Sequence, residues 1–186
     1  MTHFILCSGL AQSGKDTSAQ IIKNDLESHG YSVLITHYAD LLKFICRNFF
    51  GWDGNKDEAG RTLLQRIGTD CVRAQDPDYW VDFIVNIIRM FPSEFDYVII
   101  PDMRFPNELD RIVDAGFPVT HVHIVRPGFD NLLTDEQKKH PSENSLNKVV
   151  PDHLITNTTM AALQEQLRLV CGCIVAERKE FNSESN

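Results

Sequence analysis

The chain has 186 residues, of which 42% are hydrophobic, and it carries a formal net charge of −8. This length suits one domain with a sizeable core. The acidic balance argues against a nucleic-acid backbone as the main partner, because such a partner requires a basic surface, whereas a small anionic substrate needs only a few local cations.

Strand-like and helix-like apolar patterns alternate along the chain. Short continuous apolar runs predict buried strands, and apolar residues at helical spacing, such as Ala19, Ile22 and Leu26, predict helices. Residues 126–150 are polar and irregular. In chain order we expect a strand at 3–8, a helix at 15–28, a strand at 31–39, helices at 40–50, 60–74 and 76–91, a strand at 95–102, a helix at 105–115, strands at 119–125 and 153–157, and a helix at 159–179.

This alternation predicts an α/β fold with right-handed crossovers, in which helices cover both faces of a parallel five-stranded sheet. Ligands of such sheets bind outside the carboxyl ends of the strands. Three stretches follow strands at that edge: Gly9 to Thr17, Pro101 to Arg104, and Arg126 onward. We therefore expect a single domain over residues 1–186 with its ligand site built from these stretches.

Cysteine usage and hydropathy favour a cytoplasmic protein without a membrane partner. The five cysteines are too sparse for the disulfide framework of a small secreted domain. Cys171 and Cys173 are expected on different faces of a helix, which argues against a metal or redox pair. No apolar run reaches the length of a membrane span, and the start of the chain lacks the pattern of a signal peptide.

The stretch from Gly9 to Lys15 fits the phosphate-binding pattern G-x-x-x-x-G-K. It lies between a predicted buried strand and a predicted amphipathic helix, as a phosphate-binding loop requires. Glycines let the backbone wrap around phosphates, the helix N-terminus supplies partial positive charge, and Lys15 adds a full one. In the three-layer P-loop NTPase fold that this predicts, the expected ATP-binding residues of the loop are Gly9, Ala11, Gln12, Ser13, Gly14, Lys15, Asp16 and Thr17.

Asp16 occupies the place where the strict pattern has serine or threonine, and the hydroxyl comes one residue later, at Thr17. A carboxylate in the first turn of a helix is favourable to the helix dipole, which is a purely structural interpretation. Next to a bound triphosphate, however, it would be repulsive unless a cation intervened. We expect Asp16 to face Mg²⁺, directly or through water, with Thr17 beside it on the metal or a phosphate oxygen.

A phosphate-binding loop alone predicts nucleotide binding and no particular reaction. The stretch Leu154 to Thr158 lacks the guanine-reading motif N/T-K-x-D that a GTPase would carry. Additional arginines outside the loop indicate that two anionic substrates are brought together, as in phosphoryl transfer to a small acceptor.

The predicted helix from Arg61 onward places Arg61, Gln65, Thr69 and Arg73 at four-residue steps along one polar face. This face is either a ligand-binding surface or a solvated one. Gly68 within it costs about 1 kcal/mol relative to alanine, which indicates close approach of a ligand or of backbone.

Asp102 and Arg104 follow a predicted strand end. A carboxylate at this place can orient Mg²⁺ or an acceptor group, and an arginine can bind a phosphate through two hydrogen bonds. We expect this pair, together with Lys15, to belong to the catalytic group, to which the family resemblance described below adds Arg126.

In their order along the chain, these motifs resemble the deoxynucleoside monophosphate kinases of bacteriophages. The resemblance covers most of the chain and, beyond the loop, rests on six stretches. They are Leu64-Gln65-x-x-Gly68-Thr69-Asp70, Tyr79-Trp80-Val81, Tyr97-Val-Ile-Ile-Pro101-Asp102-x-Arg104, Glu108, His123-Ile-Val-Arg126-Pro127-Gly128 and Leu154-Ile-Thr-Asn157. The Lys-Asp-Thr variant of the loop also matches this family.

The resemblance implies transfer of the γ-phosphoryl group of ATP to a deoxynucleoside monophosphate, with Mg²⁺. By position, Lys15 would bridge the β and γ phosphates, Arg126 would lie near the transferred group or the start of a lid at 126–150, and Asn157 would lie near the donor adenine. Within residues 40–95 and after the third strand, the implied acceptor site comprises Asp40, Lys43, Arg61, Gln65, Gly68, Thr69, Trp80, Asp102, Arg104 and Glu108. Trp80 would form an aromatic wall near the base, and Arg104 would bind the acceptor phosphate.

The chain departs from the T-even phage enzyme in two ways. It lacks a long insertion before the Arg61 helix, which leaves the base specificity open. In segment 126–150 the only arginine is Arg126, so Lys138 and Lys139 either serve closure of a lid or form a solvated face. His121 and His123 share one face of their strand, where hydrogen-bonded histidines are a more ordinary interpretation than a metal pair.

Two alternatives to the nucleotide kinase remain. One is a kinase for another small metabolite, since animal-type phosphomevalonate kinase shares the Lys-Asp loop, the Gly-Thr-Asp helix and the Asp-x-Arg strand end. The other is a regulatory module that binds nucleotide without transfer. A homodimer is expected from the resemblance alone.

Overall fold

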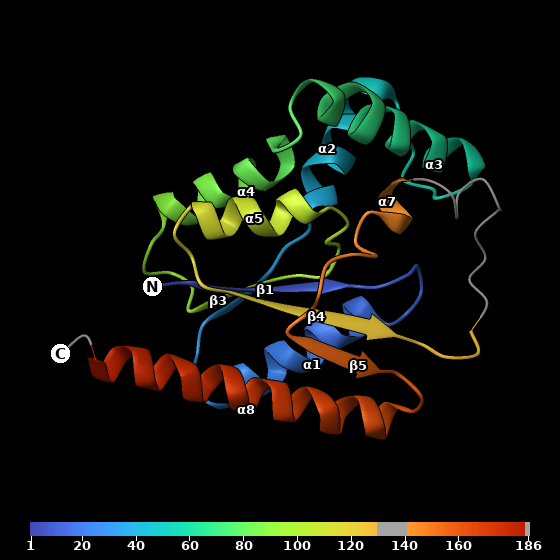
Figure 1. The fold of residues 1–186 in the computed structure, drawn as a ribbon. Coiled ribbons are helices and arrows are strands. Elements are labelled where there is room, and N and C mark those ends of the chain that lie inside the picture. The colour runs from blue at the N-terminus through green and yellow to red at the C-terminus, as the bar shows by residue number, and fades with distance from the viewer. Residues whose placement is uncertain (130–140, 185–186) are drawn as a thin grey trace.

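The computed structural model describes residues 1–129 and 141–184, and within them five parallel strands form one sheet in the order β2-β3-β1-β4-β5 (Figure 1). The strands are β1 (His3–Ser8), β2 (Val33–Ile35), β3 (Tyr97–Ile100), β4 (Val119–Val125) and β5 (His153–Thr156). β1 is central, with Phe4 opposite Val98 of β3 and Val119 of β4. The expected α/β fold is confirmed.

Helices cover both faces of the sheet and make three layers (Figure 1). Below it lie α1 (Lys15–Ser28) and α8 (Met160–Glu184). Above it lie α2 (Tyr38–Phe50), α4 (Tyr79–Met90) and α5 (Pro106–Asp114), with α3 (Glu58–Gln65) farther out. A short helix, α7 (Pro141–Asn144), precedes β5.

Alternate residues of the buried strands fill two cores, one on each face of the sheet. Ile5 and Cys7 of β1 pack with α1 and α8 residues such as Leu26 and Leu167. Phe4 and Leu6 pack on the opposite face with the inner sides of α4 and α5. All six residues of β1 are buried, as expected for a strand with helices on both sides. The rigid centre fixes the loop that follows Ser8.

The strand expected at 31–39 is shorter than its sequence pattern suggests. Only Val33–Ile35 pairs with β3, and α2 begins at Tyr38. A capping box between His37 and Asp40 supports this helix start. The tertiary fold adds to it, because the carboxylate of Asp102 accepts hydrogen bonds from the first N–H groups of α2.

The single helix expected at 60–74 is two elements. It begins earlier, as α3 at Glu58, and continues as a π-helix over Arg66–Arg73. The N–H of Ala74 reaches back to the carbonyl of Thr69, five residues earlier.

The helix expected at 76–91 starts at Tyr79, and the last predicted helix extends to Glu184. Of the irregular segment 126–150, residues 130–140, including Lys138 and Lys139, lie outside the described residues.

Candidate active site

The phosphate-binding loop between β1 and α1 has the backbone that its sequence pattern predicts. Gly9 and Gly14 have φ angles of 140° and 105°, which side chains rarely allow. A Cβ on Gly9 would also lie 2.2 Å from the carbonyl oxygen of Ile124. The ammonium group of Lys15 donates to the carbonyl oxygens of Gly9 and Leu10, each at 2.8 Å. Lys15 is therefore held over its own loop.

The ends of β4 and β5 support this loop from the side. The amide nitrogen of Asn157 donates to the carbonyl oxygen of Ser13 at 2.8 Å. Arg126 donates to the carbonyl oxygen of Gln12 at 3.4 Å and lies over the ring of Phe129, 4.2 Å from its centre. The structure thus brings both predicted donor-site residues, Arg126 and Asn157, against the loop. Asn157 holds the loop backbone itself.

Asp16 and Thr17 lie exposed in the first turn of α1, and the side chain of Asp16 is 84% exposed. It contacts Nε2 of His37 at 3.0 Å, while Nδ1 of His37 lies 3.3 Å from Asp40. Hydrogen bonding to His37 is the largest cause that lowers the pKa of Asp16, and the same bond raises the pKa of His37. No sequence motif pointed to His37, which links α1 to α2.

Exposed oxygen ligands at this place fit Mg²⁺, which usually takes one or two protein oxygens and completes its shell with water and phosphate oxygens. Asp16 and Thr17 offer such oxygens beside Lys15. Within the described residues, no group of three or more His, Cys, Asp or Glu side chains is arranged to hold a metal without a ligand's help.

A cavity of about 250 Å³ opens between the loop, α2, the α3–π-helix segment and the end of β3. Its lining residues come from both expected donor and acceptor parts. They are Ala11, Tyr38, Ala39, Leu42, Lys43, Lys56, Arg61, Leu64, Gln65, Gly68, Thr69, Arg73, Trp80, Asp102, Arg104 and Phe105. All of the predicted acceptor residues are among them except Asp40 and Glu108. Asp40 instead pairs with Lys43 at 2.9 Å.

The π-helix explains why four residues spaced by four all reach this cavity. In an α-helix each four-residue step turns about 40° past a full circle, so a polar face drifts away over successive steps. A π-helix has a wider turn, with hydrogen bonds five residues apart, and reverses that drift. Arg61 and Gln65 precede the change, Thr69 and Arg73 follow it, and all four line the cavity.

Gly68 and Trp80 form the inner wall of the cavity. The indole nitrogen of Trp80 donates to the carbonyl oxygen of Gly68 at 3.1 Å, and Trp80 is only 3% exposed. A Cβ on Gly68 would lie 2.7 Å from Cδ2 of Leu42. The close approach expected at Gly68 is therefore made by a side chain of α2.

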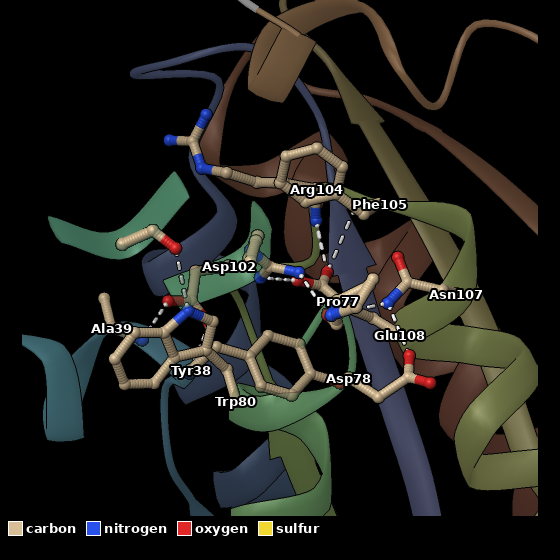
Figure 2. Close-up of polar contacts among 12 residues, drawn as sticks. Tyr38, Ala39, Pro77, Asp78, Trp80, Asp102, Arg104, Phe105, Asn107 and Glu108 are labelled. Carbon is tan, nitrogen blue, oxygen red and sulfur yellow. Dashed lines mark hydrogen bonds and ion pairs between the residues drawn. The ribbon is translucent and has the colours of Figure 1, made fainter. Parts of the chain in front are cut away.

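Asp102 directs both of its carboxylate oxygens at the start of α2. They accept hydrogen bonds from the N–H groups of Tyr38 and Ala39, each at 3.0 Å (Figure 2). Burial raises the pKa of Asp102, and the nearby charge of His37 and these two N–H groups act in the opposite direction. Asp102 thus fixes the start of α2, and with it one wall of the cavity.

Glu108 is fully buried at the first turn of α5 and does not line the cavity. One carboxylate oxygen accepts from the backbone N–H groups of Arg104, at 2.7 Å, and Phe105, at 3.1 Å (Figure 2). The other is paired with Arg73. Burial raises its pKa, and the charge of Arg73 opposes that shift. Glu108 therefore holds two arginines that do line the cavity. Sequence spacing identified Arg73 only as part of a polar face.

A second cavity of about 510 Å³ lies on the other side of Arg104 and shares Ala11 and Arg104 with the first. Its remaining lining residues are Gly9, Leu10, Ser13, Met103, His123, Ile124, Val125, Arg126, Pro127, Phe129, Leu146, Asn147, Val149, Pro151 and Leu154. The apolar lining residues that follow α7 belong to no sequence motif. They line the cavity only because the folded chain brings them back over β4.

A family model described as deoxynucleotide monophosphate kinase matches residues 47–167, more than half of the chain. Two curated relatives carry the same description. The one from Enterobacteria phage T4 is 41% identical over 70 residues, which is 37% of this chain and 28% of the relative. The one from Escherichia phage RB69 is 35% identical over 99 residues, 52% of this chain and 38% of the relative. The matches thus span well under half the length of these relatives.

Solved structures with the same fold include kinases of small metabolites. An adenylylsulfate (APS) kinase from Mycobacterium tuberculosis in complex with AMPPNP and APS has a TM-score of 0.53 at 14% identity, over 93% of this chain and 97% of that chain. A gluconokinase from Sinorhizobium meliloti 1021 has a TM-score of 0.53 at 15% identity, over 97% of each chain. At such identities the likeness shows the fold alone. In the described part of the chain, no helix has the length and apolar character of a membrane span.

Proposed function

Because the chain belongs to the deoxynucleotide monophosphate kinase family, we propose that it transfers the γ-phosphoryl group of ATP to a (deoxy)nucleoside 5′-monophosphate and releases the diphosphate. The observation that carries this proposal is the junction of the two cavities. They meet at Ala11 and Arg104, so an acceptor in the first cavity would lie next to a triphosphate on the loop.

On the donor side, the loop N–H groups and Lys15 would bind the β and γ phosphates. Lys15 now donates to loop carbonyls, and a triphosphate would take over those hydrogen bonds. Mg²⁺, when bound, neutralises charge on the phosphates, and Asp16 and Thr17 are the residues that would hold it. Arg126 and Asn157, which contact the loop backbone, would keep its shape as the nucleotide enters.

On the acceptor side, the first cavity combines cations with an apolar wall. Lys43, Lys56, Arg61, Arg73 and Arg104 line it. Its apolar wall consists of two leucines and an indole, from α2, α3 and α4: Leu42, Leu64 and Trp80. Cations suit a phosphate and a planar apolar wall suits a base, which is the combination that a nucleotide requires.

The phosphate of the acceptor is already an anion, so its attack on the γ-phosphorus needs no general base. Positioning and neutralisation of charge carry most of such a transfer. Arg104 stands at the junction of the two cavities, and its backbone is held by Glu108. Its position in the lining of both cavities supports the proposal that it contacts the incoming phosphate and the transferred group together.

The domain arrangement follows from the same proposal. Residues 40–95 would bind the acceptor, whereas the lid expected at 126–150 stays a prediction, because residues 130–140 lie outside the described residues. A cytoplasmic location and a homodimer stay predictions.

The test is release of ADP from Mg-ATP in the presence of a panel of deoxynucleoside and ribonucleoside monophosphates and phosphomevalonate. We expect turnover with one or more nucleotides, and its loss in Lys15→Ala and Arg104→Ala. Turnover with phosphomevalonate alone would show that the protein is a kinase of that metabolite and not of nucleotides. ATP binding without any acceptor-dependent turnover would support the regulatory module instead.

A further inference from the structure

Two histidines of β4 share one hydroxyl group beneath the phosphate-binding loop. Oγ of Ser8, the last residue of β1, lies 2.6 Å from Nε2 of His121 and 2.7 Å from Nδ1 of His123. Ser8 and His121 are buried, and His123 is partly buried. This trio of Ser8, His121 and His123 agrees with the interpretation of the two histidines as hydrogen-bonded residues on one strand face.

The number of protons restricts how this trio can be arranged. A serine hydroxyl carries one proton and two lone pairs, and a neutral imidazole has one N–H and one acceptor nitrogen. If both histidines donated to Ser8, its own proton would have no acceptor among the described residues, and a buried donor without a partner is costly. One histidine must therefore donate to Oγ, and the other must accept from it.

The surroundings of His121 decide the direction. Its Nδ1 is buried without a hydrogen-bond partner in the described structure. If Nε2 of His121 accepted, this Nδ1 would carry an orphaned N–H. If Nε2 donates, Nδ1 keeps only an unused lone pair, which is the less costly defect. The direction is thus from His121 to Ser8 to Nδ1 of His123.

This direction fixes His123 as the tautomer with its proton on Nε2. His123 is among the residues that line the second cavity, together with Gly9 and Arg104. Its Nε2 has no hydrogen-bond partner among the residues that the structure describes. A neutral N–H donor is therefore available at the cavity, next to the phosphate-binding loop.

We propose that His123 is a substrate-contacting residue that donates its Nε2–H to a phosphoryl oxygen of bound nucleotide, and that Ser8 and His121 are positioning residues that hold it in this tautomer. The inference rests on the proposed function. The oxygen can belong to the donor triphosphate or to the acceptor phosphate, since the second cavity touches the loop and Arg104 alike.

A neutral hydrogen-bond donor suits the position of His123 next to the phosphate-binding loop. Burial is the first cause and the charge of Lys15 the second that lower the pKa of His123, and burial lowers the pKa of His121 to about 4. Both shifts favour the neutral form of the ring. Hydrogen bonds to charged oxygens are the strong ones, so one neutral N–H can contribute measurably without adding charge beside two arginines and a lysine.

Two substitutions of His123 distinguish a direct contact with the ligand from a role in packing alone. In His123→Asn the side-chain amide can still bond Ser8 but does not reach the cavity. In His123→Gln the amide nitrogen reaches the position of Nε2, while the bond to Ser8 is lost. The dissociation constants of a non-hydrolysable Mg-ATP analogue and of the monophosphate, each measured alone by calorimetry, report which phosphate is contacted.

We expect His123→Asn to weaken one of these two ligands by about tenfold to a hundredfold, as for loss of a hydrogen bond to a charged group, and His123→Gln to recover most of that loss. The ligand affected names the source of the oxygen. Unchanged affinities in His123→Asn, or a larger loss in His123→Gln than in His123→Asn, would overturn the proposal.

A matched control is His3→Gln, because His3 is a buried histidine that also bonds a hydroxyl, that of Thr120, but does not line either cavity. It should leave both affinities unchanged. In the ligand-free wild type, ¹⁵N NMR of the histidine rings should show the Nε2–H tautomer at His123, and the Nδ1–H tautomer would contradict the proton count. That readout stays informative if no nucleotide is turned over, so failure of the proposed function and failure of this inference are distinguishable.

Discussion

Arg73 of the π-helix pairs with the fully buried carboxylate of Glu108 on α5, and its guanidinium lies 4.3 Å from the centre of the Phe105 ring. The same carboxylate accepts from the backbone N–H of Arg104. One acidic side chain therefore positions two cationic residues of the acceptor cavity without lining that cavity itself.

We expect Glu108→Gln to lower the free energy of unfolding by about 3 kcal/mol, since it leaves a largely buried arginine without its counter-charge. It should also raise KM for the monophosphate, because Arg73 and Arg104 lose their support. Urea unfolding and steady-state kinetics measure the two effects.

The control for this prediction is Arg111→Gln, which breaks the more exposed pair between Arg111 and Asp82. Exposed ion pairs contribute little. Equal losses of stability in the two variants would show that burial of Glu108 has no special weight.

Gly68 determines the width of the acceptor cavity. In Gly68→Ala the new methyl group would push the flexible tip of Leu42, 2.7 Å away, toward the cavity that both residues line. Overpacking costs on the order of 1–3 kcal/mol, so we expect KM for the monophosphate to rise about tenfold while KM for ATP is unchanged. Addition of Leu42→Val should relieve the effect. A rise in KM for ATP instead would mean that the π-helix serves the donor.

Two features favour glycine at position 14, namely its backbone φ angle and its close approach to Asn157. A Cβ on Gly14 would lie 2.5 Å from the amide nitrogen of Asn157, and the φ angle of 105° is unfavourable to alanine in any case. Asn157→Ala alone loses one hydrogen bond to the loop, about 1 kcal/mol, or about fivefold in affinity for Mg-ATP. Gly14→Ala should weaken Mg-ATP further, and the double variant should recover only the steric part. Full recovery would show that φ is unimportant here.

The pH dependence of stability should include a term from His3. Burial, with a smaller effect of Arg178, lowers its pKa from 6.5 to about 4. Between these values the unfolded chain binds a proton that the folded chain does not, so stability present above pH 6.5 is lost as the pH falls toward 4.

His3→Gln removes this term, and its unfolding free energy should fall less steeply with decreasing pH, by up to about 1.4 kcal/mol per pH unit. Urea unfolding of both proteins between about pH 5 and about pH 6.5 gives the difference, from which all other titrating groups cancel. Parallel curves would contradict a lowered pKa at His3.

The features that depend on local pattern could be predicted from sequence. The buried strand of residues 3–8, the loop ended by Gly14 and Lys15, and the helix of residues 15–28 follow from apolar runs and glycine placement, and their bounds agree with the structure. The features that depend on distant partners could not. The early start of α2 depends on Asp102, sixty-four residues away from Tyr38.

The candidate site divides in the same way. Lys43, Arg61, Gln65 and Thr69 all line the first cavity. The four-residue spacing indicated that the last three share a polar face, whereas only the resemblance to the kinase family pointed to Lys43. The π-helix that aligns them has no signature in the residues themselves. The supporting roles of Glu108 and His37 became visible only when the chain brought separate elements together.

The measurement that tests the central claim most directly is identification of the product. Purified protein, Mg-ATP and each deoxynucleoside monophosphate would be incubated, and the nucleotides separated by anion-exchange chromatography. The account predicts that ADP and one deoxynucleoside diphosphate appear in equal amounts, and that neither forms in Lys15→Ala. Formation of ADP without any nucleoside diphosphate, or no reaction with any monophosphate, would contradict it.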